Sequence, residues 1–390
     1  MRKEEDCSSL LYRIRPSGPM FKFYPHRATL NYYIGCSHNC QYCYARYTMK
    51  NVGWEPDDFG RNICIKANAA EVLEKELQKK TWKQTYNGII HLGTVQDPFQ
   101  PVERQYHLTD KVLNLLYEHR KPVTILTKSA YVQESLEVLK KMASEKLVHV
   151  DFSVAYTDEE LRQKLEPGAS TFGERFQAMK TLHDNGISVG IFLNPVLPHY
   201  TERSLEDIFS RGRDCGAAYA MLGFIHLNRS NYADLKKCLS ERKPGTDFER
   251  YFNLKGRSIC VQEDECMEVA KHCYGLSRKY GVPLITSRYH QFLTGEYDFG
   301  VFRYRYPLVF DYVKLMKRNA DRKVSFAQAV ETADRFCHDN SYITSLKWYW
   351  ENEKLFSDFD YLDIEASVEN GEKYYTLHSG PESMDTGWSG

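Results

Sequence analysis

The chain has 390 residues, enough for one large domain or for a core with an accessory domain, because domains commonly run to about 100 to 200 residues. Its 52 lysines and arginines balance 52 aspartates and glutamates, which excludes a global positive field directed at nucleic acid or at an anionic membrane. No run of about 18 apolar residues is present, and the charged N-terminus lacks an apolar leader, so we expect a cytoplasmic protein without a membrane span.

Residues 1–26 are expected to form an irregular lead-in, because three prolines and a glycine interrupt them. From residue 27 onward, apolar runs rich in β-formers alternate with segments of helical period. The expected strands are 28–34, 88–93, 122–127, 147–154, 187–194 and 218–227, and the expected helices lie near 67–80, 106–119, 131–144, 172–185 and 202–214. Such alternation predicts an α/β fold with a parallel sheet and crossover helices.

Beyond residue 228 the alternation weakens. The expected elements there are a helix near 261–280, a short strand at 281–286, and helices near 306–318, 325–338 and 341–352. We therefore expect a catalytic core at 27–228, a mostly helical C-terminal extension at 229–350, and an acidic, weakly ordered tail at 351–390. The arginine- and tyrosine-rich run at 302–306 fits a solvated helix face better than a phosphate-binding surface, given the neutral total charge.

Three cysteines, Cys36, Cys40 and Cys43, lie within eight residues of one another. No fourth cysteine follows close by, so the spacing favours a 4Fe-4S cluster in which one iron stays free to bind another ligand. The alternative is a Cys3His zinc site with His38 as the fourth ligand. Zinc sites usually combine two separated pairs of ligands, which a single compact triplet does not provide.

Five short segments follow the ends of predicted strands, and the carboxyl ends of parallel strands meet at one edge of a sheet or barrel. These segments are the cysteine loop, Gly93-Thr94, Thr127-Lys128-Ser129, Phe152-Ser153 and Asn194-Pro195. Together with Leu165-Glu166-Pro167-Gly168 and residues 186–195, they resemble the radical S-adenosylmethionine superfamily, in the branch that contains spore photoproduct lyase. The resemblance covers about residues 27 to 227 and implies a partial (β/α)6 TIM-type barrel.

The resemblance also implies cofactors. Cys36, Cys40 and Cys43 would ligate three irons of one 4Fe-4S cluster, and the fourth iron would chelate the amino and carboxylate groups of S-adenosylmethionine. Reductive cleavage would then yield a 5′-deoxyadenosyl radical that abstracts hydrogen from a substrate. An electron donor such as a flavodoxin or ferredoxin is the implied partner, and no membrane is implied.

By the same resemblance, Lys128 would contact the methionyl carboxylate and Ser153 would lie near the cofactor. Gly93 and Thr94 would let the backbone meet the methionyl amino group, and Asn194 would lie by the adenine, although a capping asparagine before proline is the alternative. Tyr44 matches a tyrosine that assists hydrogen transfer in the branch. Its plainer role, shared with Tyr42, is to shield the cluster from solvent.

One departure separates this chain from spore photoproduct lyase. The lyase uses a cysteine near the end of its second core strand as hydrogen donor, but here no cysteine occurs between Cys64 and Cys215. The nearby Asp97 and Glu103 are instead candidates for proton transfer or for binding a polar substrate, unless the loop with Pro98 holds them for structural reasons. The substrate stays open between a nucleic acid, a peptide and a small molecule.

Two further alternatives concern metal sites. A zinc- or cluster-containing module that binds nucleic acid without radical chemistry would explain the cysteines but not the strand-end segments. Cys260, Cys266 and Cys273 lie at gaps of six and seven residues, which raises the possibility of an auxiliary cluster. Buried thiols that pack as small apolar side chains are the commoner explanation.

Overall fold

The structure is a computed structural model. It describes residues 1–13, 26–79, 89–242, 247–255, 258–285, 306–334, 346–347, 349–353, 355–356 and 362–379. The chain divides into two compact units. The core unit comprises Met1–Tyr12, Thr29–Glu76 and His91–Ile285, and the second unit comprises Arg13–Ala28, Leu77–Ile90 and Thr286–Gly390.

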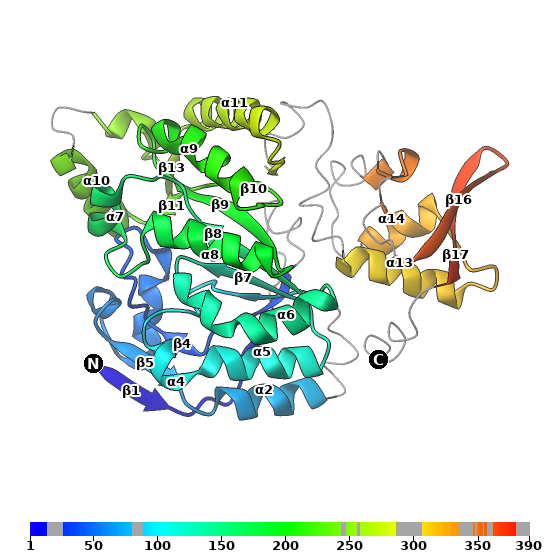
Figure 1. The fold of residues 1–390 in the computed structure, drawn as a ribbon, viewed down its shortest axis with the longest axis horizontal. Helices are drawn as coiled ribbons and strands as arrows, with labels where there is room; N and C mark the ends of the chain where they lie inside the picture. Colours follow the sequence, from blue (N-terminus) through cyan, green and yellow to red (C-terminus); the bar gives the residue numbers. More distant parts are fainter. Residues whose placement is uncertain are drawn as a thin grey trace. The chain divides into compact units, whose positions relative to one another are not determined.

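A central sheet of eight strands has the order β14-β10-β9-β8-β7-β6-β3-β2. Figure 1 labels its strands β10, β9, β8 and β7. Its strands are β2 (Leu11–Arg13), β3 (His26–Leu30), β6 (Ile89–Leu92), β7 (Val123–Thr127), β8 (Val148–Ser153), β9 (Ser188–Val196), β10 (Ala220–Phe224) and β14 (Leu284–Ile285). The pairs from β7 through β8, β9 and β10 to β14 are parallel. All six strands expected in the core region are therefore present, and so is the short strand expected near residue 284.

Helices connect these strands, as the crossover rule for parallel strands requires. They are α2 (Ala69–Gln78), α4 (Glu103–Tyr106), α5 (Leu108–Glu118), α6 (Leu136–Ser144), α7 (Glu159–Leu165), α8 (Phe172–Asp184), α9 (Thr201–Asp214), α10 (Arg229–Arg242) and α11 (Glu263–Tyr280). In Figure 1, α8, α6, α5 and α2 lie side by side, one below another. Among the described residues, no helix is both long enough and apolar enough to span a membrane.

Helix α8 shows why these segments are helical. A capping box at its start joins the Thr171 hydroxyl and the Glu174 carboxylate to each other's backbone N–H groups. Its buried face repeats every three or four residues, with Phe172, Phe176 and Met179 buried.

The lead-in and the region after residue 228 differ from expectation because they contain strands. β1 (Arg2–Glu5) pairs in parallel with β5 (Ile63–Lys66), and β5 pairs antiparallel with β4 (Tyr33–Ile34). A second small sheet joins β11 (His226–Leu227), β13 (Ile259–Val261) and β12 (Phe252–Asn253). β1 has the sequence Arg-Lys-Glu-Glu, so it shows no apolar alternation, and only its backbone pairing with β5 makes it a strand.

The second unit has its own core. Its described elements include α13 (Tyr306–Arg318), β15 (Lys323–Ser325), α14 (Phe326–Asp334), β16 (Asp363–Glu369) and β17 (Glu372–Ser379), and the strands have the order β15-β17-β16. Tyr312, Trp350 and Tyr375 are buried in its aromatic cluster. Residues 302–305 and 341–345 lie outside the described residues.

The expectation of a weakly ordered tail was wrong for residues 363–379, which form the hairpin of β16 and β17. Asn370 and Gly371 turn the chain between the strands, and both have positive φ angles, of 53° and 82°. An Asn-Gly pair with this geometry matches the right-handed twist of a hairpin. The strands bury Tyr375 and Leu377 on one face. The expectation of a weakly ordered tail was based on the acidic composition of the segment, which does not reveal that one face of the hairpin is buried.

Candidate functional site

The three cysteines lie on one tightly turned loop that precedes the 3-10 helix η1 (Tyr44–Val52). The Cys36 N–H donates to the Phe59 carbonyl over 3.1 Å, and the Cys43 N–H donates to the Cys40 carbonyl over 3.1 Å. Gly35 precedes the loop with a φ of 87°, and a Cβ there would lie 2.4 Å from the Asn62 carbonyl oxygen. Only glycine fits this close approach, so the local sequence positions the first cysteine.

Burial dominates the chemistry of the three thiols. It raises the pKa of Cys36 well above its usual value, that of Cys40 to about 12, and that of Cys43. In the opposite direction, the backbone N–H groups of Asp97 and His38 lower the pKa of Cys36, and the Lys128 cation lowers those of Cys40 and Cys43. Buried thiols become thiolates when they bind a metal, and N–H donors to the sulfurs are typical of iron-sulfur sites. The donor set therefore fits a 4Fe-4S cluster.

The zinc alternative needs His38 as a fourth ligand. The His38 side chain is buried and its Nδ1 lies 3.4 Å from an Asp97 oxygen. Among the residues that the structure describes, no three His, Cys, Asp and Glu side chains, those of the cysteine loop included, are gathered closely enough to hold one metal ion. The His38 imidazole has the Asp97 carboxylate as its partner.

Three of the residues expected to bind the cofactor come together across adjacent strands. The Lys128 ammonium, just after β7, donates to the Ser153 hydroxyl on β8 over 2.7 Å, and that hydroxyl donates to the Asn194 carbonyl on β9 over 2.7 Å. The Lys128 ammonium also lies 5.8 Å from the centroid of the Tyr42 ring, next to Cys43. An ammonium group has three donors, so Lys128 can bind an anion while it holds Ser153.

The turn after β6 has contacts of another kind. Gly93 has a φ of 95°, and a Cβ there would lie 2.2 Å from the Leu126 carbonyl oxygen, so packing against β7 requires glycine. The Thr94 hydroxyl contacts the Thr29 hydroxyl at 2.7 Å and the Asn31 carboxamide oxygen at 3.1 Å. The half-exposed Tyr44 donates its hydroxyl to the Thr94 carbonyl over 2.5 Å. The expected roles of Gly93, Thr94 and Tyr44 in binding or hydrogen transfer stay predictions.

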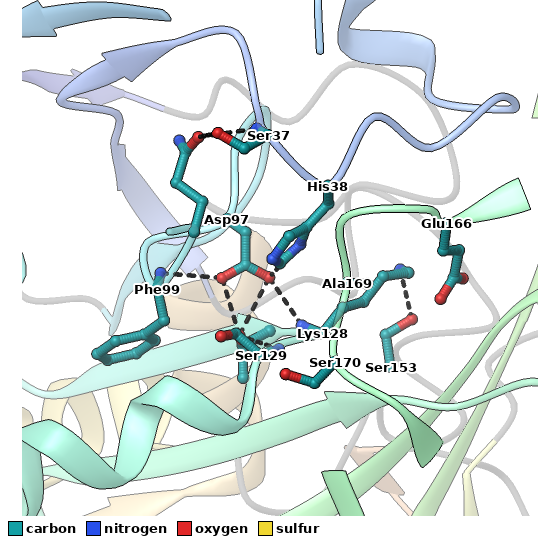
Figure 2. Close-up of polar contacts among 12 residues, drawn as sticks. Ser37, His38, Asp97, Phe99, Lys128, Ser129, Ser153, Glu166, Ala169 and Ser170 are labelled. Atoms are coloured by element: carbon teal, nitrogen blue, oxygen red, sulfur yellow. Dashed lines mark hydrogen bonds and ion pairs between the residues drawn. The ribbon is translucent and has the colours of Figure 1, made fainter. Parts of the chain in front are cut away.

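Asp97 lies at the centre of the polar contacts in Figure 2. Its carboxylate accepts from the Thr127 hydroxyl at 2.8 and 3.0 Å, from the Lys128 backbone N–H at 2.7 Å and from the Phe99 backbone N–H at 2.9 Å. Burial raises the pKa of Asp97, but the His38 imidazole and these donors outweigh burial, so the pKa lies below its usual value. Asp97 is therefore a buried carboxylate that accepts hydrogen bonds from three other residues, Phe99, Thr127 and Lys128.

Glu103 is buried at the start of α4. Its carboxylate accepts from the Tyr33 hydroxyl and from the Thr109 backbone N–H, the latter over 2.6 Å. Burial raises its pKa to about 7, although both donors act in the opposite direction. The catalytic roles suggested for Asp97 and Glu103 stay predictions, and the contacts found for Glu103 connect protein segments.

A buried ion pair in the same region was not expected from the sequence. The Glu166 carboxylate lies 2.5 Å from the Arg175 guanidinium and also accepts from the Tyr42 hydroxyl. Burial raises the pKa of Glu166, but the Arg175 and Lys128 cations outweigh it, so the pKa is lowered. Arg175 lies on the apolar face of α8, and an arginine at such a position was the one sequence signal for this pair.

The proposed auxiliary cluster has no assembled ligand set. Cys260 lies on β13, whereas Cys266 and Cys273 are buried on α11, where the Cys266 thiol contacts the Val261 carbonyl at 3.7 Å. All three belong to the described residues, among which no three His, Cys, Asp and Glu side chains are gathered closely enough to hold one metal ion. They pack as buried or half-buried side chains.

Residues 30–211 match the model of the Radical SAM superfamily. The chain is 31% identical over 227 residues to the uncharacterized protein Rv2578c of Mycobacterium tuberculosis, which covers 57% of this chain and 65% of that protein. It is 28% identical over 248 residues to the uncharacterized protein MJ0683 of Methanocaldococcus jannaschii, which covers 60% of this chain and 88% of that protein. The match thus spans slightly less than two thirds of the first of these relatives.

Among solved structures, the fold is similar to that of a spore photoproduct lyase complexed with dinucleoside spore photoproduct. The TM-score is 0.54 at 16% sequence identity, and the similarity covers 73% of this chain and 81% of that chain. At this identity the likeness concerns the fold. It confirms an α/β architecture with the parallel sheet typical of the partial barrel.

Proposed function

Because this chain belongs to the radical S-adenosylmethionine superfamily, we propose that it is a radical enzyme whose cluster is held by Cys36, Cys40 and Cys43. The observation that carries the proposal is the position of the Lys128 ammonium, which donates to the Ser153 hydroxyl over 2.7 Å and lies 5.8 Å from the centroid of the Tyr42 ring, next to Cys43. When bound, the cluster and S-adenosylmethionine supply a one-electron cleavage to methionine and a 5′-deoxyadenosyl radical, which takes hydrogen from the substrate.

The chain's own residues bind, orient and exclude water. Lys128 offers a compact positive charge to the methionyl carboxylate, and Ser153 holds that ammonium in place across the strand boundary. Asn194 accepts from Ser153 and brings a third strand to the same edge. The buried cysteine loop keeps water from the reacting groups.

The contacts of Lys128, Ser153 and Asn194 bear on the cofactor and do not distinguish between classes of substrate. The segment 91–97 contains no cysteine, so the proposal does not include a thiol that returns hydrogen to a product radical at this strand end. A nucleic acid, a peptide and a small molecule remain the substrate candidates, with a reaction of the lyase or oxidoreductase type. A flavodoxin or ferredoxin is the proposed electron donor.

A nucleic-acid-binding module without radical chemistry is the weaker candidate. It would need only the cysteines, whereas the match to the superfamily extends over residues 30–211 and includes the strand ends with Lys128 and Ser153. The balanced charge of the chain gives such a module no general attraction to phosphate groups.

Anaerobic reconstitution with iron and sulfide tests the proposal. The reconstituted protein should absorb near 400 nm, and reduction in the presence of S-adenosylmethionine should produce 5′-deoxyadenosine that chromatography detects. Cys40→Ala is the control and should produce none, because one iron loses its ligand. Absence of the nucleoside from the reconstituted wild type, or equal amounts from Cys40→Ala, would overturn the proposal.

A further inference from the structure

We propose that Asp97 and Glu166 are positioning residues that hold the cysteine loop in register with Lys128 and Ser153. This inference rests on the proposed function and deepens it, because it names residues that act through the cysteine loop and through Lys128 and Ser153. Each carboxylate joins the loop to the end of a different core strand. Figure 2 shows both in the same region as Lys128 and Ser153.

Asp97 makes the first connection, from the loop to the end of β7. On the loop side, its carboxylate pairs with His38. Its backbone N–H is a hydrogen-bond donor to the Cys36 thiol and acts to lower the pKa of that thiol. On the strand side, the same carboxylate accepts from the Thr127 hydroxyl and from the backbone N–H of Lys128 over 2.7 Å. Asp97 therefore sets the distance between the first cysteine and the backbone from which the Lys128 cation extends.

Glu166 makes the second connection, from the loop to the end of β8. It accepts from the Tyr42 hydroxyl, whose residue precedes Cys43, and it pairs with Arg175. Arg175 donates in turn to the Ser153 carbonyl over 2.9 Å. Three buried side chains thus join the third cysteine to the residue that holds the Lys128 ammonium.

The backbone after Glu166 also grips the loop. The Gln41 N–H donates to the Leu165 carbonyl over 2.9 Å, and the Gly168 N–H donates to the His38 carbonyl over 3.1 Å. A Cβ at Gly168 would lie 2.0 Å from the Ser37 carbonyl oxygen, so only glycine permits this approach. The segment 165–168 therefore lies directly against the loop.

The two connections meet in the 2.7 Å hydrogen bond between the Lys128 ammonium and the Ser153 hydroxyl. A closed path of contacts therefore runs from the loop through Asp97 to Lys128 and Ser153, and back through Arg175 and Glu166. Burying these charges costs free energy, and a geometric requirement gives a reason to retain them. Displacement of a positioned group by about 1 Å can cost a hundredfold in rate.

The first experiment uses Asp97→Asn in the reconstituted full chain. The amide has one acceptor oxygen fewer, so it cannot satisfy the Thr127 hydroxyl and both backbone N–H groups. We expect iron and sulfide contents equal to the wild type, and a Kd for S-adenosylmethionine, measured by anaerobic equilibrium dialysis, that is at least about tenfold higher. The EPR spectrum of the reduced cluster should also change less on adding S-adenosylmethionine.

A double-mutant cycle with Lys128→Ala separates positioning from a general structural role. If Asp97 acts through Lys128, the double variant should bind S-adenosylmethionine as weakly as Lys128→Ala alone. Losses that multiply in the double variant would overturn the inference, and so would an unchanged Kd in Asp97→Asn. If Asp97→Asn loads no iron, Thr127→Val decides by the same measurements, because it removes only one partner of Asp97.

Tyr42→Phe tests the second connection without breaking the buried ion pair. It removes the hydroxyl that Glu166 accepts, and we expect a three- to tenfold higher Kd at unchanged iron content. The matched control is Tyr47→Phe, since Tyr47 is exposed on η1, and its Kd should equal the wild-type value. If the wild type itself neither assembles a cluster nor binds S-adenosylmethionine, the proposed function fails. If the wild type binds and Tyr42→Phe binds equally well, only the positioning role fails.

Discussion

The core unit buries charged side chains in addition to its apolar core, whereas the described hydrophobic cluster of the second unit is apolar and aromatic. In the core unit, Asp97, Glu166 and Arg175 are buried charged residues near the cysteine loop. Glu166 pairs with Arg175, and Asp97 pairs with His38. In the second unit, the buried cluster consists of apolar and aromatic side chains, including Trp350 and Tyr375. Apolar burial stabilises a fold directly, whereas buried charges must be compensated one by one. We therefore infer that, near the cysteine loop, the buried charges maintain the positions of the site residues at a cost in the free energy of folding.

Removal of one buried charge should have the largest effect. Glu166→Ala leaves Arg175 buried without its carboxylate, and we expect the free energy of unfolding to fall by about 3 to 5 kcal/mol. Chemical denaturation of the apoprotein measures this loss. Glu166→Leu with Arg175→Met is the control and should recover most of the stability, because neither charge remains. A double variant as unstable as Glu166→Ala would contradict this account of the pair.

A cavity in the second unit should affect stability and leave the chemistry unchanged. Leu377 is fully buried in the aromatic cluster, so Leu377→Ala should lower the free energy of unfolding by about 3 kcal/mol. At a temperature where the variant is folded, 5′-deoxyadenosine formation should match the wild type. A lower yield from folded Leu377→Ala would show that the two units do not differ in the way described.

The pH dependence of stability should reveal Glu103. In the unfolded chain this carboxyl ionises near pH 4.5, whereas burial in the folded protein raises its pKa to about 7. The folded protein therefore binds more protons between these values, and its stability falls as the pH rises through this window. The loss should be on the order of 3 kcal/mol, since the pKa differs between 4.5 and about 7 and one pKa unit corresponds to about 1.4 kcal/mol.

Glu103→Gln provides the comparison for that titration. The amide oxygen can still accept from the Thr109 N–H, and the Tyr33 hydroxyl can accept from the amide nitrogen. Unfolding midpoints measured from pH 4.5 to pH 8 should fall less in Glu103→Gln than in the wild type. Parallel curves for the two proteins would contradict the raised pKa of Glu103.

The smallest effect is expected at the surface of the second unit. Lys323 forms an ion pair with Glu369 between β15 and β16, and the Glu369 side chain is half exposed. Water and salt screen such a pair, so Lys323→Ala should shift the thermal midpoint by no more than about 1 °C. A large shift would mean that charge also organises the second unit.

Much of the core fold was predictable because its signals are local. The strands β6 to β10 are apolar runs of four to nine residues followed by helical periods, and each of these patterns can be recognised within one segment. The meeting of Lys128, Ser153 and Asn194 followed from a general rule, since parallel strands place their carboxyl ends at one edge. The cysteine triplet itself is a contiguous motif.

The tertiary structure decided what these local patterns leave open. From the sequence, Asp97 was a candidate for proton transfer, for binding a polar substrate or for a structural role, and only the structure shows that its carboxylate contacts His38 on the loop and the backbone N–H of Lys128 after β7. Glu166 lies 124 residues from its partner Tyr42, and no local pattern encodes a pairing over that separation. β1 likewise became a strand only through β5, some sixty residues away.

The sequence by itself determined which residues are candidates for the chemistry, because the expected cluster ligands and the ends of strands lie in short contiguous segments. Only the tertiary structure determined how those segments are held in register. Register depends on buried hydrogen bonds and ion pairs between distant residues, such as Asp97 with Lys128 and Glu166 with Arg175. These interactions become strong only after the surrounding core has excluded water, because the protein interior has a lower dielectric constant than water.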